Sequence, residues 1–237
     1  MGVLKTKGIV ISENNFGDYD KMLTILTPGM GKIGCVAKGA RRPKSLLMAG
    51  SQFLCFGDYM LFKGNNTYTM NSCETIEIFY NIRMDIDKLI IASELNKIIL
   101  DVTTENQNTY KILQLYLNTL YVLSEMDMDT KLLTSTFKLR LLSLLGFSPN
   151  VKECANCKKQ DDISYFSIRD NGFKCSSCGK SDKGAISILP ETRDSIKYIF
   201  MSPAKKLYSF QTSPEAVKEL EIISKVYFNE KLEKEYK

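Results

Sequence analysis

The sequence contains no histidine among its 237 residues. Histidine is the commonest general acid–base residue near neutral pH, and it is the usual non-cysteine ligand of an open catalytic zinc site. Without histidine, serine and cysteine side chains lack the base that most often activates them as nucleophiles. The composition therefore disfavours a zinc hydrolase, and we predict that the protein is not an enzyme.

Long apolar runs are also missing. The longest ones are interrupted by Lys, Asp or Asn, and none approaches the roughly 18–20 residues that cross a bilayer. We see no charged-then-apolar leader with a small-residue cleavage site and no phosphate-binding loop of the G-x-x-x-x-G-K-[ST] type. These absences predict a cytoplasmic protein that has no membrane partner and no ATP-driven motor chemistry.

The overall composition is ordinary for a globular protein, with 44% hydrophobic and 25% charged residues. A chain of 237 residues can bury a sizeable core in one or two domains with a small insert. The formal net charge of +5 permits a polyanionic partner without requiring one. How the charge is distributed therefore matters more than its sum.

Residues 1–80 carry the pattern of β-strands. Pro28-Gly29 and Gly64-Asn65-Asn66 are turn signals between strands. The expected strands are rich in β-branched, aromatic or alternating apolar residues, and they cover Gly8–Ile11, Tyr19–Thr27, Lys32–Lys38, Phe53–Phe62 and Thr67–Phe79. Five short strands in this length predict a small closed barrel, with an OB-fold as the leading candidate and an SH3-like barrel as the alternative.

From about residue 84 the apolar residues recur with helical spacing. Helices are expected from about residue 84, at about 109–124, at about 129–145 and from Ser213-Pro214 to about Lys234. The predicted fold class is α+β and multidomain. A five-stranded OB-fold barrel occupies residues 1–80, and an all-α helical domain at 81–237 carries an inserted four-cysteine zinc ribbon at about 151–184.

The ribbon is predicted from two cysteine pairs, Cys154-x-x-Cys157 and Cys175-x-x-Cys178. This spacing is a strong zinc signature, because each pair places two thiolates on one knuckle and two knuckles complete a closed tetrahedral site. The segment between the pairs, at 165–173, has the pattern of a short hairpin with a glycine-assisted turn. We predict one structural Zn²⁺ on these four residues. Two disulfides, which suit an oxidising compartment, are the alternative.

One glycine pattern does not carry its usual meaning. Residues 29–34 match the G-x-G-x-x-G dinucleotide fingerprint, but that motif needs a helix directly after it to hold the pyrophosphate. Here the chain continues as a predicted strand. We therefore assign these glycines to a hairpin.

A basic segment follows the third expected strand. Lys38, Arg41, Arg42 and Lys44 place four cations within seven residues that also include Gly39 and Pro43, which is typical of an exposed loop. Such a cluster attracts phosphate, and counterion release drives the affinity. We predict these four residues as nucleic-acid contacts. Others that could extend the patch are Lys5, Lys7, Lys32 and Lys63, and aromatic residues that could stack on bases are Phe16, Tyr19, Phe53, Tyr59 and Tyr68.

Taken together, barrel, helices and four-cysteine ribbon resemble the RecO family of bacterial recombination mediators over almost the whole chain. The basic segment at 38–45, the Leu144-Leu145-Gly146-Phe147-Ser148-Pro149 stretch before the first cysteine pair, and the opening Lys7–Ile11 with Tyr19-Asp20-Lys21 carry this resemblance. Neither the basic segment nor the cysteine spacing is specific for this family by itself, but the combination of the two is.

The resemblance implies a non-enzymatic role in DNA repair. It implies binding of single- and double-stranded DNA, annealing of complementary strands, and cooperation with RecR to load the RecA recombinase onto DNA coated by single-strand-binding protein, whose C-terminal tail docks on the helical domain. It implies a bacterial cytoplasmic protein that associates with the nucleoid during repair. It also implies Lys38, Arg41, Arg42 and Lys44 as DNA contacts and the four cysteines as zinc ligands.

Three other functional interpretations are compatible with the same residues. An RNA- or ribosome-associated protein with an OB-fold and a zinc ribbon fits the physical pattern equally well, since neither the barrel nor the patch identifies the sugar. A protein-binding scaffold would make the basic segment incidental, and a zinc enzyme would need an exchangeable water on the metal.

Overall fold

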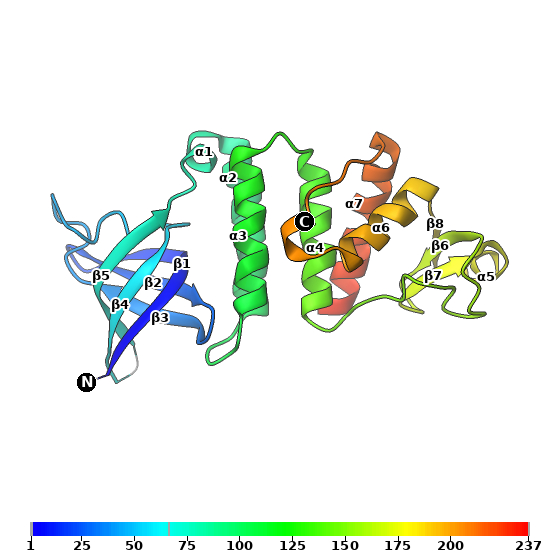
Figure 1. The fold of residues 1–237 in the computed structure, drawn as a ribbon. Helices are drawn as coiled ribbons and strands as arrows, with labels where there is room; N and C mark the ends of the chain where they lie inside the picture. The colour runs from blue at the N-terminus through cyan, green and yellow to red at the C-terminus, as the bar shows by residue number, and fades with distance from the viewer. Residues whose placement is uncertain (1, 66, 237) are drawn as a thin grey trace. The chain divides into compact units, whose positions relative to one another are not determined.

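The computed structural model describes residues 2–65 and 67–236, and close packing divides the chain into two compact units, Met1–Glu125 and Met126–Lys237. The first unit contains a barrel and three helices (Figure 1). Its elements are β1 (Val3–Phe16), β2 (Asp20–Thr27), β3 (Gly31–Ala37), β4 (Phe56–Lys63), β5 (Tyr68–Glu77), α1 (Tyr80–Met84), α2 (Ile86–Val102) and α3 (Tyr110–Glu125).

The barrel is closed in the strand order β1-β2-β3-β5-β4. All neighbouring strands are antiparallel except β3 and β5, which run parallel where they close the barrel. A five-stranded Greek-key barrel is the architecture of the OB-fold, so the leading prediction, an OB-fold and not an SH3-like barrel, is confirmed. Asn66 of the predicted turn between β4 and β5 lies outside the described residues.

One long strand joins the two halves of the barrel. The first half of β1 pairs with β4 and the second half with β2, and a bulge separates Val10 from Ser12 where the strand bends. Gly8 lies opposite Gly57 at this bend. A Cβ on Gly8 would lie 2.6 Å from Cγ2 of Ile25, and one on Gly57 would lie 2.6 Å from the carbonyl oxygen of Glu74. Side chains at these two positions would prevent the strands on either side of the bend from packing this closely.

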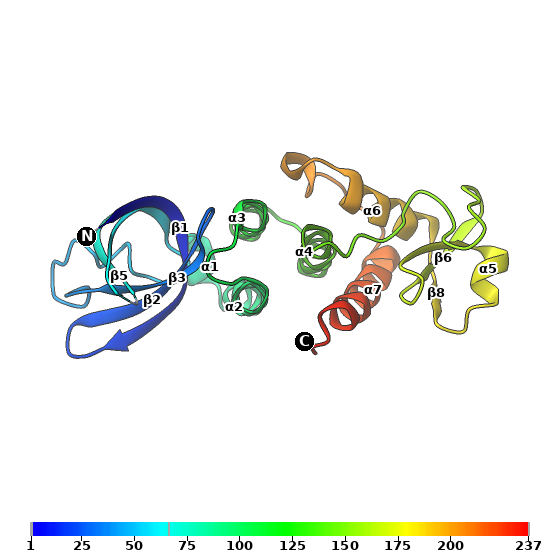
Figure 2. The same ribbon diagram turned by 90° about the horizontal axis from the view of Figure 1, so that it is seen from below.

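Helices α2 and α3 pack side by side in the first unit (Figure 2) and are joined to the barrel by buried polar contacts. The buried Asn96 of α2 donates to the carbonyl oxygen of Ile11, at 2.8 Å, and accepts from the Tyr116 hydroxyl of α3. Ile11 is the residue at the β1 bulge, where the ladder leaves a carbonyl group free for another donor. The amide of Asn96 therefore joins three elements at one buried point.

The segment between α2 and α3 also docks on the barrel. The backbone N–H of Lys32 donates to Thr104, and those of Asn106 and Thr109 donate to Met30 and Pro28 in the β2–β3 hairpin. The glycines of the G-x-G-x-x-G pattern lie in this hairpin and its second strand, as predicted. Gly31 has a φ of 66°, and a Cβ there would overlap the Thr104 carbonyl oxygen.

The second unit combines three long helices with a small sheet. Its elements are α4 (Thr130–Leu144), β6 (Ile163–Ser167), β7 (Gly172–Cys175), α5 (Ser176–Lys180), β8 (Ala185–Ser187), α6 (Pro190–Met201), the 3₁₀ turn η1 (Ala204–Lys206) and α7 (Pro214–Leu232). Ser213 caps α7 with Pro214 in its first turn, as predicted. The helices predicted at about 109–124 and 129–145 are confirmed as α3 and α4 to within a residue or two.

The predicted ribbon is confirmed as a hairpin of β6 and β7, and it gains a third strand, β8, that the sequence pattern did not show. Its inner side packs on α7, where the rings of Phe166 and Tyr227 meet edge-to-face at 5.4 Å. The Tyr227 hydroxyl donates to the carbonyl oxygen of Phe147, at 3.0 Å. The ribbon is thus anchored on the longest helix of its own unit.

The predicted domain boundary at residue 80 follows the change from strand to helix. The division into compact units instead falls after Glu125, because α1, α2 and α3 pack with the barrel. The boundary at residue 80 stays a prediction. None of the helices in the described residues is both long enough and apolar enough to span a membrane.

The chain between β3 and β4 forms a compact series of turns. Its backbone N–H groups donate three or four residues back, among them Arg42 to Gly39, Ser45 to Arg42, Met48 to Ser45 and Ser51 to Leu47. The far end is fixed by the buried Tyr59, whose hydroxyl donates to the carbonyl oxygens of Gly50 and Cys55, at 3.0 Å from each. The connection is therefore a folded segment held against the barrel.

We expect Tyr59→Phe to lower the free energy of unfolding by about 1–3 kcal/mol, because two buried carbonyl groups lose their common donor. Urea denaturation followed by circular dichroism measures this difference. Tyr110→Phe on the exposed side of α3 is the matched control, with an expected change within about 0.5 kcal/mol. Equal stability of the two variants would contradict the role given to Tyr59.

Candidate nucleic-acid interface and metal centre

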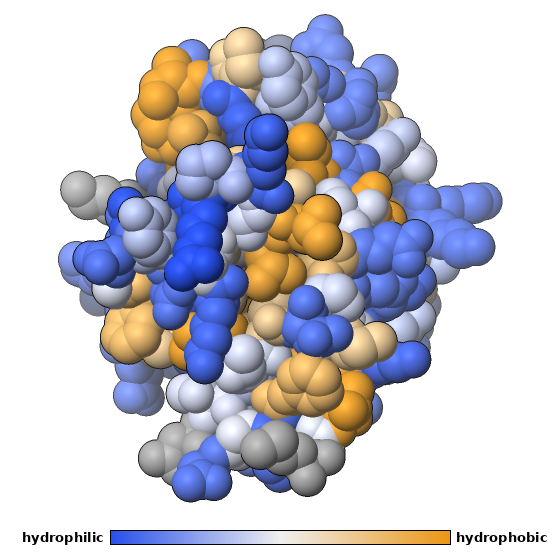
Figure 3. Space-filling view, turned by 90° about the vertical axis from the view of Figure 1, so that its left-hand side faces the viewer, coloured by the Kyte–Doolittle hydropathy of each residue, from blue (hydrophilic) through white to orange (hydrophobic). Residues whose placement is uncertain are grey.

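The basic loop, residues 38–45, begins directly after β3 at one end of the barrel. The side chains of Lys38, Arg41, Arg42 and Lys44 are all exposed. Lys44 has a φ of 63°, an uncommon conformation for a residue other than glycine. Figure 3 looks toward the barrel side of the molecule, where strongly hydrophilic side chains lie beside hydrophobic ones.

The basic loop is fastened to the turn between β1 and β2. The Asp20 carboxylate accepts from the backbone N–H of Gly39, at 2.7 Å, and the Tyr19 carbonyl oxygen accepts from the N–H of Arg41, at 2.9 Å. The Arg41 guanidinium also donates to the carbonyl oxygen of Asp18, at 3.2 Å. These bonds place the loop and the turn on one continuous surface, and the turn between strands 1 and 2 is part of the usual ligand-binding side of an OB-fold.

Aromatic rings lie next to the cations of this surface. The Arg42 guanidinium lies over the Tyr19 ring, 5.3 Å from its centroid. Tyr19 is 49% exposed, and Phe16 at the end of β1 is 52% exposed. Of the other aromatic residues considered for stacking, Tyr59 is buried, whereas Phe53 and Tyr68 are half-buried. Stacking faces are thus available on Phe16 and Tyr19.

The four additional lysines occupy different settings. The Lys32 ammonium donates to the carbonyl oxygen of Leu100, at 2.7 Å, and therefore ties β3 to α2. Lys63 is exposed at the end of β4. Lys5 and Lys7 border a hollow of about 400 Å³ on β1, β4 and β5 that Asp58 and Glu74 also line. The carboxylates offset the lysine charge there. Among the described residues, no hydrogen bond or ion pair joins Lys5, Lys7, Lys32 or Lys63 to the basic loop.

The two cysteine pairs converge in the second unit. The four Sγ atoms lie within 4.8 Å of one another, and those of Cys157 and Cys175 are 3.6 Å apart. A tetrahedral zinc site with Zn–S bonds of 2.3 Å has sulfurs about 3.8 Å apart, whereas a disulfide needs about 2.05 Å. All four residues are free cysteines. The donor set and its spacing fit a metal ion held by four thiolates.

The backbone shapes both knuckles. Lys158 follows Cys157 with a φ of 65°, and its N–H donates to the carbonyl oxygen of Cys154, at 3.0 Å. The second pair opens α5, with Cys175 at its N-cap position. The N–H of Ala155 donates to the carbonyl oxygen of Phe173, at 2.8 Å, which joins the first knuckle to β7.

The thiols are poised for metal binding in different ways. Burial alone would raise the pKa of Cys154, but backbone N–H groups around its sulfur, first that of Cys157, outweigh burial and lower it. The Ser177 hydroxyl and the N–H of Cys178 lower the pKa of Cys175 to about 6. Sharing of hydrogen bonds with Cys175 and Cys157 raises the pKa of Cys178 to about 12. A dication would displace the protons that the cluster otherwise retains.

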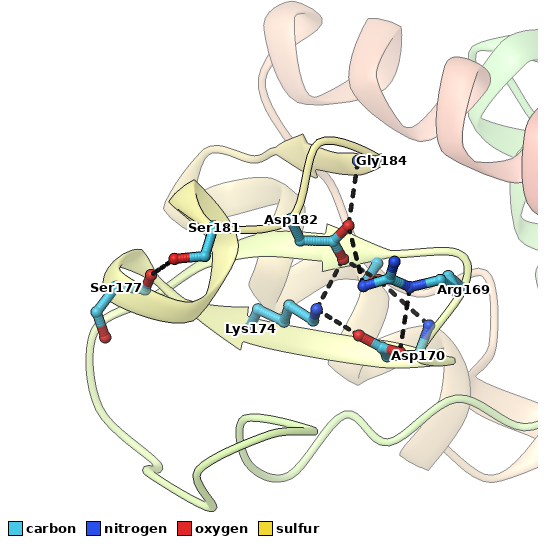
Figure 4. A network of polar contacts seen from close by, with 8 residues as sticks. Arg169, Asp170, Lys174, Ser177, Ser181, Asp182 and Gly184 are labelled. Carbon is cyan, nitrogen blue, oxygen red and sulfur yellow. Dashed lines mark hydrogen bonds and ion pairs between the residues drawn. The ribbon is translucent and has the colours of Figure 1, made fainter.

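A buried ionic network stabilises the ribbon that carries the four cysteines (Figure 4). Lys174 of β7 is almost fully buried, and its ammonium pairs with Asp170 and, at 2.7 Å, with Asp182. Asp182 also accepts from the Ser167 hydroxyl, at 2.8 Å, and from the N–H of Gly184, at 3.1 Å. Lys174, followed by Ser167 and Gly184, holds the pKa of Asp182 well below its usual range. Every charge in this network therefore has a partner, as a buried ion pair requires.

The sequence patterns missed two parts of these sites. The first is the contact of the Asp20 carboxylate with the N–H of Gly39, which orients the basic loop and which no sequence pattern indicates. The network of Lys174 was also missed. No local pattern signals it, because strand side chains alternate between two faces and a lysine between Phe173 and Cys175 is expected to face solvent.

Comparison with known proteins covers both halves of the chain. The family model described as Recombination protein O N terminal matches residues 1–79, and the one described as Recombination protein O C terminal matches residues 83–237. Similar proteins named DNA repair protein RecO come from Acetivibrio thermocellus, at 45% identity over 100% of this chain and 94% of the relative, and from Alkaliphilus metalliredigens, at 32% identity over 95% and 92%. A further one comes from Bacillus subtilis, at 30% identity over 95% and 88%.

The matches agree with the architecture, since the first family model ends with the barrel and the second includes the cysteine cluster. They confirm the resemblance drawn from the basic loop and the cysteine spacing. The chain belongs to the RecO family of DNA repair proteins.

Proposed function

We propose that this protein is a non-enzymatic mediator of DNA repair and recombination that binds single- and double-stranded DNA and anneals complementary strands. The observation that carries the proposal is the basic loop on an OB-fold barrel, fastened to the β1–β2 turn and flanked by exposed Tyr19 and Phe16. The names of the similar proteins support DNA repair as the setting.

The proposed DNA contacts are Lys38, Arg41, Arg42 and Lys44, with Lys5, Lys7, Lys32 and Lys63 as further candidates. Lys32 is the weakest of these, because its ammonium is already bonded to Leu100. Contacts to phosphate carry no sequence information, so two strands can be gathered without being read. Neutralising their phosphates reduces the repulsion between the strands and lets complementary bases find each other. This mechanism requires neither a cofactor turnover nor a catalytic residue.

The second unit is proposed to hold one structural Zn²⁺ on Cys154, Cys157, Cys175 and Cys178. A bound Zn²⁺ would supply folding free energy to the ribbon, because the ligands converge only when the ribbon is folded. Four thiolates fill the tetrahedron and leave no position for a substrate. The metal is therefore assigned a structural role.

Membership of the RecO family supports a proposal about the partners. We propose that the protein acts with RecR to place the RecA recombinase on DNA coated by single-strand-binding protein, whose C-terminal tail it binds. We place this action in the bacterial cytoplasm, at the nucleoid during repair. An annealing assay with complementary strands coated by single-strand-binding protein tests the proposal. Preferential binding of RNA over DNA without annealing would instead favour an RNA- or ribosome-associated role.

Replacement of both Arg41 and Arg42 by Ala is expected to weaken DNA binding about tenfold or more at low salt, on every sequence tested. The slope of log affinity against log salt should fall by about 2, since each lost phosphate contact removes about one unit. Fluorescence anisotropy of labelled oligonucleotides at several salt concentrations measures both values.

Lys205 and Lys206, exposed in η1 of the second unit, provide a control that removes the same charge. Their double replacement by Ala should leave the affinity within about twofold and the slope unchanged. Equal losses in the two double variants would show that net charge, and not the basic loop, governs binding.

The metal proposal predicts one zinc per chain by elemental analysis and none in a variant with Cys157→Ser and Cys178→Ser. The thermal unfolding of the second unit should shift to lower temperature, because the metal contributes to folding of the ribbon. DNA affinity should change by less than about threefold, since the basic loop lies in the other compact unit. A loss of DNA binding as large as that of the arginine variant would assign the metal centre a direct part in the interface.

A further inference from the structure

The connection between β3 and β4 carries an apolar side chain in full contact with solvent. Leu46 is 95% exposed, more than any other large hydrophobic residue among those described, and Met48 is 40% exposed. Their neighbour Leu47 instead packs against the barrel core. The chain thus buries one apolar residue of this short stretch and displays the other two.

The exposure of Leu46 is built into the backbone. The N–H of Ser45 donates to the carbonyl oxygen of Arg42, at 3.1 Å, and the N–H of Met48 donates to that of Ser45, at 3.2 Å. The Ser45 hydroxyl accepts from the N–H of Leu47, at 3.3 Å. Leu46 therefore follows one hydrogen-bonded turn, at 42–45, and lies inside the next, at 45–48, which holds its backbone in place. Its side chain extends from a fixed support.

The residues around Leu46 favour a ligand that carries negative charges beside apolar surfaces. It lies two residues after Lys44 and four after Arg42, so it is at most about 14 Å from Arg42 along the chain. No Asp or Glu occurs in the sequence between Asp20 and Asp58. Nucleic acid combines phosphates, which suit the cations, with base faces, which suit a leucine. An acidic protein surface would also satisfy the cations, but only one that carried an exposed apolar side chain beside its carboxylates would cover the leucine.

We propose that Leu46, with Met48 beside it, inserts against the bases of the DNA whose phosphates the basic loop binds. Proteins that deform DNA commonly insert Leu or Met between base steps and partly unstack them. The proposal rests on the proposed DNA binding and deepens it. Cations hold the backbone of a strand, and the leucine separates its bases, so that the bases are presented for pairing with a second strand.

The first test removes the apolar side chain from the full-length protein. Leu46→Ser should weaken binding of single-stranded oligonucleotides about tenfold, because the free energy of burying one leucine side chain corresponds to a change in affinity of about that size. The slope of log affinity against log salt should stay unchanged. In an oligonucleotide containing 2-aminopurine, the fluorescence increase that reports unstacking should occur with the wild type and be lost with Leu46→Ser. Met84→Ser, at a position that is 69% exposed on α1, is the matched control and should behave as the wild type.

The second test places a reporter at the same position. The chain has no tryptophan, so Leu46→Trp gives a protein with a single indole. Stacking on bases should quench its emission and shield it from iodide when DNA is bound, whereas the indole of Met84→Trp should stay accessible. Retained annealing by Leu46→Trp would show that a larger apolar wedge substitutes for leucine.

These experiments distinguish failure of the wedge from failure of DNA binding. Unchanged DNA affinity and 2-aminopurine signal in Leu46→Ser, with DNA binding by the wild type intact, would overturn the wedge alone. If the same variant instead lost binding of a protein partner, Leu46 would belong to a protein-docking surface and the wedge would again be wrong. Absence of DNA binding by the wild type at low salt would overturn both the proposed function and the wedge.

Discussion

Closure of the barrel through β1 is the constraint on which the first unit depends. A single strand pairs with β4 along its first half and with β2 along its second, and the bend between the halves requires glycine on both facing strands. The bulge at this bend frees the Ile11 carbonyl group, which Asn96 uses to attach α2 and α3. The same strand ends at the turn that holds the basic loop. One strand thus sets the positions of the helices and of the candidate DNA-binding surface.

Local patterns were sufficient for much of this architecture. Five strands, the long helices and the two knuckles were all predictable, because β-branched runs, helical periodicity and C-x-x-C spacing depend on residues close in sequence. Contacts between distant residues were not predictable. The packing of α2 on the barrel depends on Asn96, a polar residue within an otherwise ordinary helical pattern. The third strand of the ribbon, β8, is only three residues long and leaves almost no pattern.

The candidate sites show the same division. The cations of the basic loop could be found from composition, whereas the contacts of Arg41 and Arg42 with the β1–β2 turn join positions about twenty residues apart. The four cysteines could be found from spacing, whereas the buried Lys174 and its carboxylates could not, because a lysine in a strand usually faces solvent. This network supports the hairpin between the knuckles by means other than sulfur. Two independent sets of interactions therefore stabilise the folded ribbon, the ionic network and the cysteine cluster.

The two kinds of cation in the basic loop have different kinetic consequences. Arg41 and Arg42 are held in place before any ligand arrives, by backbone carbonyl groups and by the Tyr19 ring, so little side-chain freedom remains to be lost when they contact phosphate. Contacts of this kind set how long a complex lasts. Lys38 and Lys44 are exposed charges, and exposed charges act at long range on the rate of encounter. In the proposed complex with DNA, we therefore expect dissociation to depend mainly on the arginines, and salt-sensitive capture of a strand to depend on the whole cluster.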